Sequence, residues 1–293
     1  MGVYYFYSEF FFDENSWNTQ SVSVENEKFA RELCGKGNAM ELNTDHFWVG
    51  PGKVYLDYEE PVYYQTSPEN TIKKFIYRGC TLLLCQMPVL SHTNYKEKFN
   101  QFKKQLSGMA IDYMIVPRLP VSILKPDLVR YFGRKRLPFI LLDANNEQEL
   151  KEVKWEWIQQ AQGLTQIPLL LVTEVQTKNE NKKIAGTWES IVETYGIFTI
   201  IESSLAVPLS KNMLKMTGIS PYKGEILAQA SADYNLYLQH KVQSIDEQPE
   251  FRYHKAIPEV TVAKGRVIKV NHIIQCLEGS GSYTHVSIPR HFI

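Results

Sequence analysis

The hydrophobic positions between residues 51 and 217 follow two alternating patterns. Short continuous apolar runs, such as residues 80–87, have the length of buried β-strands. Between these runs apolar residues recur at helical spacing, as Tyr95, Phe99 and Phe102 do. The predicted strands are residues 54–56, 80–87, 111–116, 139–142, 167–172 and 196–201. Strands that are separated by helices of this size predict parallel βαβ units with right-handed crossovers.

The expected helices and the length of residues 51–217 indicate how large the barrel is. Asn146 is typical of a helix start and predicts one helix over residues 147–163. The polar stretch 177–183 predicts a loop before the next helix at residues 187–195. The whole region is roughly two thirds of the ~250 residues that a complete eight-unit barrel needs. We therefore expect an α/β fold with an incomplete or shortened TIM-type (β/α) barrel of five or six strands.

Both ends of the chain are rich in strand signals and poor in helix signals. Residues 3–12 are aromatic and strand-prone. The period-two alternation after Gln20 favours a hairpin over residues 21–32, and a helix over residues 25–33 is the alternative. We therefore expect two domains, a composite β-sandwich and the barrel: residues 1–50 with 219–293, and residues 51–218.

Composition and charge argue against several functional classes. The chain has 293 residues, 44% of them hydrophobic, which is enough for a sizeable core. Its 32 basic and 32 acidic residues cancel, whereas nucleic acids and anionic membranes call for a basic excess. No apolar run reaches the length of a membrane span, and the first residues lack the basic region of a signal peptide. We expect a soluble, cytoplasmic protein that binds neither nucleic acid nor membrane.

The cysteines carry no recognisable site. Cys34, Cys80, Cys85 and Cys276 show no C-x-x-C spacing and are too few for a disulfide scaffold of this length. Cys80 and Cys85 also lack a histidine partner nearby that would activate a thiolate. We expect free, buried thiols.

Acidic residues follow several of the predicted strands. Asp57 and Glu59 lie in the stretch PGKVYLDYEEP, and Asp143 and Glu174 follow two later strands. Because the C-terminal ends of parallel strands meet at one edge, these carboxylates, with His92 on a neighbouring loop, are the pocket candidates. Carboxylates suit magnesium or manganese, but acidic residues are also common where strands become loops. No Ser-His-Asp arrangement is present, so we assign no catalytic residue. We also expect no cofactor.

Six stretches along the chain carry motifs of one enzyme family. They are SVSVENEKFARE, the Pro-Gly turn with the following Glu60-Pro61, TIKKFIYRGCTLLLCQMP, IDYMIVPRL, GISPYKGEILAQASADYNLYL and VTVAKGRVIKV. These stretches resemble the cyclic amidohydrolases of the dihydroorotase, hydantoinase and allantoinase type. The resemblance implies a TIM-type barrel beside a small β-sandwich, oligomers, and hydrolysis of a cyclic amide with one or two bound metal ions.

The metal ligands of that family are not matched. Asp57 and Glu59 stand where its His-x-His pair would fall, PFILLD has no bridging lysine, and residues 172–174 lack the fifth-strand histidine. The departure implies an amidohydrolase-like protein that has lost its metal centre and acts by binding or assembly, as a homo-oligomer or with a protein partner. The alternative is a diverged hydrolase of cyclic amide C–N bonds that holds a divalent metal through carboxylates.

Overall fold

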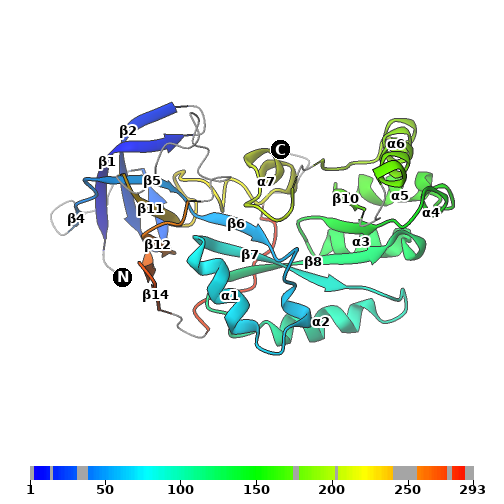
Figure 1. Cartoon of the computed structure of the whole chain (residues 1–293), viewed down its shortest axis with the longest axis horizontal. Helices are drawn as coiled ribbons and strands as arrows, with labels where there is room; N and C mark the ends of the chain where they lie inside the picture. The colour runs from blue at the N-terminus through cyan, green and yellow to red at the C-terminus, as the bar shows by residue number, and fades with distance from the viewer. Residues whose placement is uncertain are drawn as a thin grey trace.

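The computed structural model describes residues 3–13, 16–31, 39–173, 178–201, 204–239, 256–275 and 279–287. Two β-sheets lie one after the other along the long axis of the molecule (Figure 1). One is five-stranded, parallel and accompanied by helices, and the other is nine-stranded and built from both ends of the chain. No helix in the described ranges is long and apolar enough to cross a membrane.

The parallel sheet forms a curled half-barrel. Its strands pair in chain order and are β6 (Lys53–Leu56), β7 (Cys80–Pro88), β8 (Asp112–Pro120), β9 (Ile140–Asp143) and β10 (Leu169–Val172). The prediction of a mixed α/β fold with an incomplete parallel barrel is confirmed. The sixth strand expected over residues 196–201 is wrong, because this stretch makes only one parallel bridge, between Thr199 and Leu169.

Helices cover the outer face of the half-barrel. They are α1 (Pro68–Tyr77), α2 (Tyr95–Gln105), α3 (Pro126–Arg134), α4 (Glu147–Lys151), α5 (Trp155–Gly163) and α6 (Lys178–Tyr195), with the 3₁₀ turns η2 (Val62–Tyr64) and η3 (Val121–Ile123). Their buried faces form one core with residues of the sheet, which includes Phe99, Phe132 and Ile158. The apolar face predicted from the spacing of Tyr95, Phe99 and Phe102 is confirmed, because all three are buried in α2.

Two helix predictions are wrong in their boundaries. The single helix expected over residues 147–163 is broken, since the indole Nε1 of Trp155 donates to Leu150 O at 2.7 Å and takes a carbonyl that a continuous helix would use. The loop expected over residues 177–183 is helical instead, because α6 begins at Lys178. Its buried Ile184 and Trp188 extend the apolar stripe towards that end.

The inner face of the half-barrel is covered by the same chain. Helix α7 (Lys211–Thr217) is capped by Ser210, whose Oγ accepts a hydrogen bond from Met213 N at 3.1 Å. Met213 and Leu214 form one buried cluster with strand residues such as Leu84 and Val116. The apolar inner surface of the incomplete barrel is therefore buried within the chain.

The nine-stranded sheet joins the two ends of the chain. Its strands are β1 (Tyr4–Asp13), β2 (Ser16–Glu25), β3 (Lys28–Ala30), β4 (Met40–Leu42), β5 (Phe47–Pro51), β11 (Tyr234–Leu238), β12 (Val260–Ala263), β13 (Arg266–Val270) and β14 (Ile273–Ile274). Antiparallel pairing of β5 with β11 makes the connection. The hairpin reading of residues 21–32 is confirmed as far as Arg31, with positive φ at Asn26 and Glu27 in its turn. The two-domain division and the β-sandwich stay predictions.

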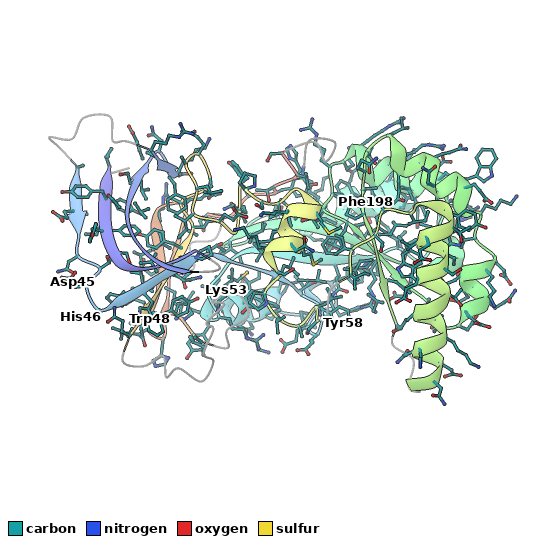
Figure 2. The ribbon with its side chains drawn as sticks, turned by 90° about the horizontal axis from the view of Figure 1, so that it is seen from above. Asp45, His46, Trp48, Lys53, Tyr58 and Phe198 are labelled. Carbon is teal, nitrogen blue, oxygen red and sulfur yellow. The ribbon has the colours of Figure 1, made fainter. Side chains whose placement is uncertain are left out.

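A single residue, Gly52, joins the two sheets. Pro51 is the last residue of β5 and Lys53 is the first of β6, so the Pro-Gly pair expected to form a turn is a passage from one sheet to the other. A Cβ atom at Gly52 would lie 2.4 Å from Thr81 Oγ1, and only glycine fits there. Figure 2 shows Lys53 at this junction, between the terminal strands and the half-barrel.

A buried charge network ties the two sheets together at the start of β8. We call its members, Asp112, Lys223, Asp233 and Lys264, the base network. Lys223 Nζ lies 2.5 Å from Asp233 Oδ2 and 2.9 Å from Asp112 Oδ2. Lys264 Nζ lies 2.6 Å from Asp112 Oδ1. Burial alone would raise the pKa of Asp112, but the two ammonium groups hold it below its ordinary value.

The last described segment, residues 279–287, runs beside β8 at this end. Tyr113 N donates to Ser282 O at 3.1 Å, and Thr284 N donates to Tyr113 O at 2.8 Å. A Cβ atom at Gly281 would lie 2.0 Å from the carbonyl oxygen of Ile111, so the close approach of the two backbones requires glycine. The segment is thus held against the start of β8 by these hydrogen bonds and by one parallel bridge, between Tyr113 and Tyr283.

Candidate functional site

Four polar side chains form a row across the C-terminal ends of neighbouring parallel strands. Asp57 follows β6, Gln86 lies in β7, Arg118 lies in β8, and Asp143 ends β9. We call these four residues the mouth row. The parallel register brings the strand ends together, with Pro88 opposite Arg118 and Pro120 opposite Asp143. The row therefore occupies the edge of the sheet where barrel proteins usually carry their chemistry.

Asp57 is the fully buried end of the row. Its Oδ2 accepts from Val62 N at 2.8 Å, and its Oδ1 accepts from Gln86 N at 2.8 Å and from Gln86 Nε2 at 3.2 Å. Burial raises the pKa of Asp57 to about 7, although these N–H groups pull in the opposite direction. Both carboxylate oxygens are used to hold the turn after β6 against β7.

Arg118 and Asp143 form the other end of the row, which reaches solvent. Arg118 Nε lies 2.9 Å from both carboxylate oxygens of Asp143, and Arg118 Nη2 lies 2.9 Å from Oδ1. Arg118 Nη1 donates to Gln86 Oε1 at 3.1 Å, and its guanidinium carbon lies 5.5 Å from the ring centre of Tyr58. This multiply bonded, charge-assisted pair has a fixed orientation and nearly cancels its own charge.

A cavity of about 310 Å³ opens above this pair, and we call it the mouth cavity. Gln86, Arg118 and Asp143 contribute its polar surface. Its remaining walls are apolar or aromatic: Pro61, Tyr63, Tyr64, Pro88, Leu90 and Pro120. The volume lies at the lower end of the range of small-molecule and cofactor pockets.

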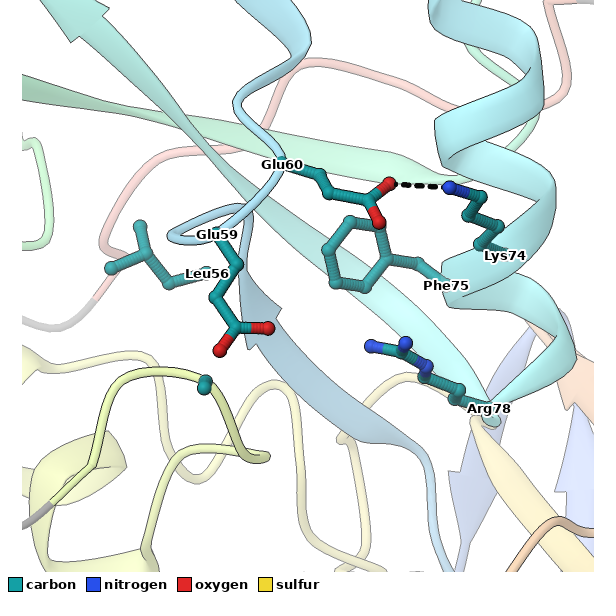
Figure 3. Close-up of a pocket in the computed structure, with 7 residues that line it drawn as sticks. Leu56, Glu59, Glu60, Lys74, Phe75 and Arg78 are labelled. Atoms are coloured by element: carbon teal, nitrogen blue, oxygen red, sulfur yellow. Dashed lines mark hydrogen bonds and ion pairs between the residues drawn. The ribbon is translucent and has the colours of Figure 1, made fainter.

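Glu59 and Glu60 lie around a different, much smaller hollow (Figure 3). It encloses about 20 Å³, which is room for a water molecule. Glu60 Oε2 pairs there with Lys74 Nζ at 2.7 Å, between exposed side chains. Glu59, predicted to share a pocket with Asp57, therefore lines this hollow and does not line the mouth cavity.

The remaining sequence candidates do not join the mouth row. His92 is exposed on the loop between β7 and α2 and does not line the mouth cavity. Glu174 lies outside the described residues. Cys80 and Cys85 are free and fully buried, as expected, and burial raises the pKa of both thiols. Cys34 and Cys276 also fall outside the described ranges.

The mouth row does not fit the metal site that the family resemblance implies. Asp57 already accepts hydrogen bonds at both oxygens, and Asp143 faces a guanidinium group. A divalent metal needs several carboxylate or imidazole ligands with lone pairs that point at one position. In the described part of the chain, no group of three or more His, Cys, Asp or Glu side chains is placed to hold a metal ion.

Sequence reasoning missed Gln86, Arg118, Tyr63 and Tyr64. A signal was present, because each of two consecutive apolar strands carries one polar residue two positions before a proline, in Gln-Met-Pro and Arg-Leu-Pro. Such residues lie at the C-terminal edge of the sheet. Their pairing with the carboxylates could not be seen, since it depends on the register between β7, β8 and β9.

Two further buried amines lie at the opposite end of β6. Lys53 Nζ donates to Ala256 O at 2.9 Å, and Lys269 Nζ donates to Pro258 O. Burial, with the neighbouring Lys269, lowers the pKa of Lys53 to about 7, and burial lowers that of Lys269 to about 8. Both amines hold the segment before β12 against the junction of the two sheets.

Comparison with known proteins identifies the fold. No protein-family model and no curated protein sequence matches the chain. Among solved structures, dihydropyrimidinase from Brevibacillus agri superimposes with a TM-score of 0.60 at 12% identity, over 97% of this chain and 99% of that chain. D-hydantoinase from Thermus sp. gives 0.58 at 10% identity, over 98% and 100%. L-hydantoinase from Arthrobacter aurescens gives 0.56 at 11% identity, over 97% and 99%.

The chain has an amidohydrolase-like fold. The structural similarity extends along almost the whole chain. At these identities the likeness shows the fold alone, so the activity has to be argued from the site itself.

Proposed function

We propose that this amidohydrolase-like protein acts by binding or assembly through its mouth cavity, without a hydrolytic metal centre. The observation that carries the proposal is the state of the two carboxylates in the mouth row. Asp57 is fully buried and saturated by N–H donors, and Asp143 is neutralised by Arg118. A hydrolytic metal would need these oxygens as ligands and an open position for water. The row therefore supports a rigid binding surface better than a reaction centre.

The alternative is a diverged hydrolase that acts on cyclic amide C–N bonds with a carboxylate-held divalent metal. One observation favours it, because Asp143 is half-buried and borders the mouth cavity. In this role Asp143 would have to give up a guanidinium partner that it contacts through both oxygens. Metal binding would then compete directly with the ion pair.

Elemental analysis of protein purified without chelator separates the two functions. We expect no near-stoichiometric zinc, manganese or magnesium, and no cyclic-amide hydrolysis when any of these ions is added. Asp57→Asn and Asp143→Asn test the mouth row, and Asp127→Asn, on the exposed start of α3, is the matched control. A stoichiometric metal that is lost from the two mouth variants but kept in the control would establish the hydrolase instead.

Self-association and a cytoplasmic location belong to the same proposal. The inner face of the half-barrel is covered by α7, so it is not a contact surface between copies of the chain. The proposal of a homo-oligomer therefore relies on exposed surfaces and on the fold resemblance. Light scattering across the micromolar range tests it, and a monomer throughout that range would contradict it.

A further inference from the structure

Exposed apolar side chains gather at the rim of the mouth cavity. Tyr63 is 44% exposed, Tyr64 is 69% exposed and Leu90 is 69% exposed. The two tyrosine rings meet edge to face with their centres 5.1 Å apart, and Tyr63 also packs against Phe102. Tyrosine and arginine are the residues that most often anchor protein interfaces. Two tyrosines in mutual contact and an arginine therefore share the lining of this cavity.

The frame of this cavity is rigid. Pro88 and Pro120 are the last residues of β7 and β8, and Pro61 follows β6 and precedes η2, so each of three neighbouring strands has a proline at or after its C-terminal end. Proline has a fixed φ and no N–H, so it offers apolar surface without a backbone donor. The tyrosine hydroxyl groups at the rim can instead donate hydrogen bonds to an incoming chain.

The charge of the cavity selects an uncharged occupant. Arg118 and Asp143 are its charged lining residues, and they neutralise each other at 2.9 Å. The paired groups offer little net charge to a charged ligand group, whereas a neutral chain that displays carbonyl oxygens can bind without competing for either partner. A polyproline II segment has this chemistry, because it is uncharged and its carbonyl groups have no internal partners.

We propose that the mouth cavity binds a proline-rich segment of a partner protein in the polyproline II conformation. Aromatic-lined grooves recognise such segments by packing proline rings between aromatic side chains, and the stiff ligand loses little entropy on binding. Here the exposed faces of Tyr63 and Tyr64, whose rings touch edge to face, supply the aromatic surface, and Leu90 adds apolar surface to the same lining. The inference rests on the binding role proposed above and names the partner for the same site.

Fluorescence anisotropy with a labelled polyproline peptide of about ten residues, roughly 31 Å long, tests the proposal on the full chain. We expect saturable binding that weakens at least about tenfold in Tyr64→Ala. Tyr64→Phe keeps the ring and loses the hydroxyl, so it should weaken binding by roughly two- to tenfold. Trp157→Ala removes an aromatic side chain of similar exposure, at 55%, from a separate cavity between α3 and α5, and should leave binding unchanged.

Three results would overturn the inference. The first is no binding of the peptide, and the second is equal binding by wild type and Tyr64→Ala. The third is a dimer that Tyr64→Ala converts to monomer, because the occupant would then be a second copy of this chain. Because Tyr64 is largely exposed, thermal unfolding should confirm that the variant remains folded. The metal analysis described above is independent of all three results, so a failure of the peptide leaves the broader binding role separately testable.

Discussion

Two polar networks occupy opposite ends of β8 and are built on different principles. At the base, Asp112 opens the strand and belongs to a cluster in which each buried charge faces an opposite charge. At the mouth, Arg118 pairs with Asp143 beside the cavity, and Gln86 connects this pair to the buried carboxylate of Asp57. In barrels, residues at the N-terminal ends of strands mainly serve stability and those at the C-terminal ends serve function. The contrast agrees with a stabilising role for the base network and with the binding role proposed for the mouth row.

The largest effect is expected from Lys223→Met in the base network. Lys223 is the ammonium group shared by Asp112 and Asp233, and all three side chains are at most 2% exposed. Removing it leaves two buried carboxylates with one partly exposed lysine side chain nearby, so we expect a loss of about 3–5 kcal/mol of unfolding free energy. Urea denaturation measures this loss.

Lys74→Met is the matched control for that experiment. Lys74 pairs with Glu60 at 2.7 Å, but the two side chains are 59% and 43% exposed. Its removal should cost at most about 1 kcal/mol, since water replaces the lost partner. Equal losses in the two variants would mean that the base network has no special role in stability.

The pH dependence of stability probes the buried end of the mouth row. Burial raises the pKa of Asp57 from 3.8 to about 7, so the folded protein keeps this proton over a range in which the unfolded chain has lost it. Stability should therefore fall as pH rises from about 4 to about 7, by up to about 4 kcal/mol, and this contribution should change no further above that range.

Asp57→Asn isolates that contribution, because asparagine does not titrate. We expect a lower stability in the variant at acidic pH, where an amide NH₂ group faces an N–H donor, but a flatter profile between pH 4 and 7. Thermal unfolding at a series of pH values measures both proteins. Parallel profiles would show that Asp57 does not titrate in this window.

The two networks also differ in how much the sequence revealed. Apolar runs predicted the parallel strands, and strand-end position singled out Asp57 and Asp143. Glu59, however, lines a separate hollow. It follows Asp57, whose carboxylate is buried, and so lies beyond the inward-facing end of the strand. The base network was missed because Asp112, Lys223, Asp233 and Lys264 come from distant segments, although all four lie in stretches that carried the family resemblance. Spacing along a chain indicates neither which buried charges meet nor which oxygens are already occupied.

The smallest effect is expected at the open end of the mouth row. Arg118→Lys keeps the positive charge but loses the planar group that contacts both oxygens of Asp143. Because the two side chains are 20% and 31% exposed, we expect a loss of about 1 kcal/mol in urea denaturation. Arg130→Lys, in the more exposed pair with Asp127, should change stability by less than about 0.5 kcal/mol.

A double-mutant cycle then separates the ion pair from the packing of the arginine stem. Combining Arg118→Met with Asp143→Asn should give a coupling energy of about 1 kcal/mol, whereas the same cycle at Arg130 and Asp127 should give a value near zero. A coupling at the mouth as small as that of the exposed pair would mean that Arg118 and Asp143 are not preorganised. The neutral floor on which the binding proposal relies would then be lost, because either group would be available to a charged ligand or a metal.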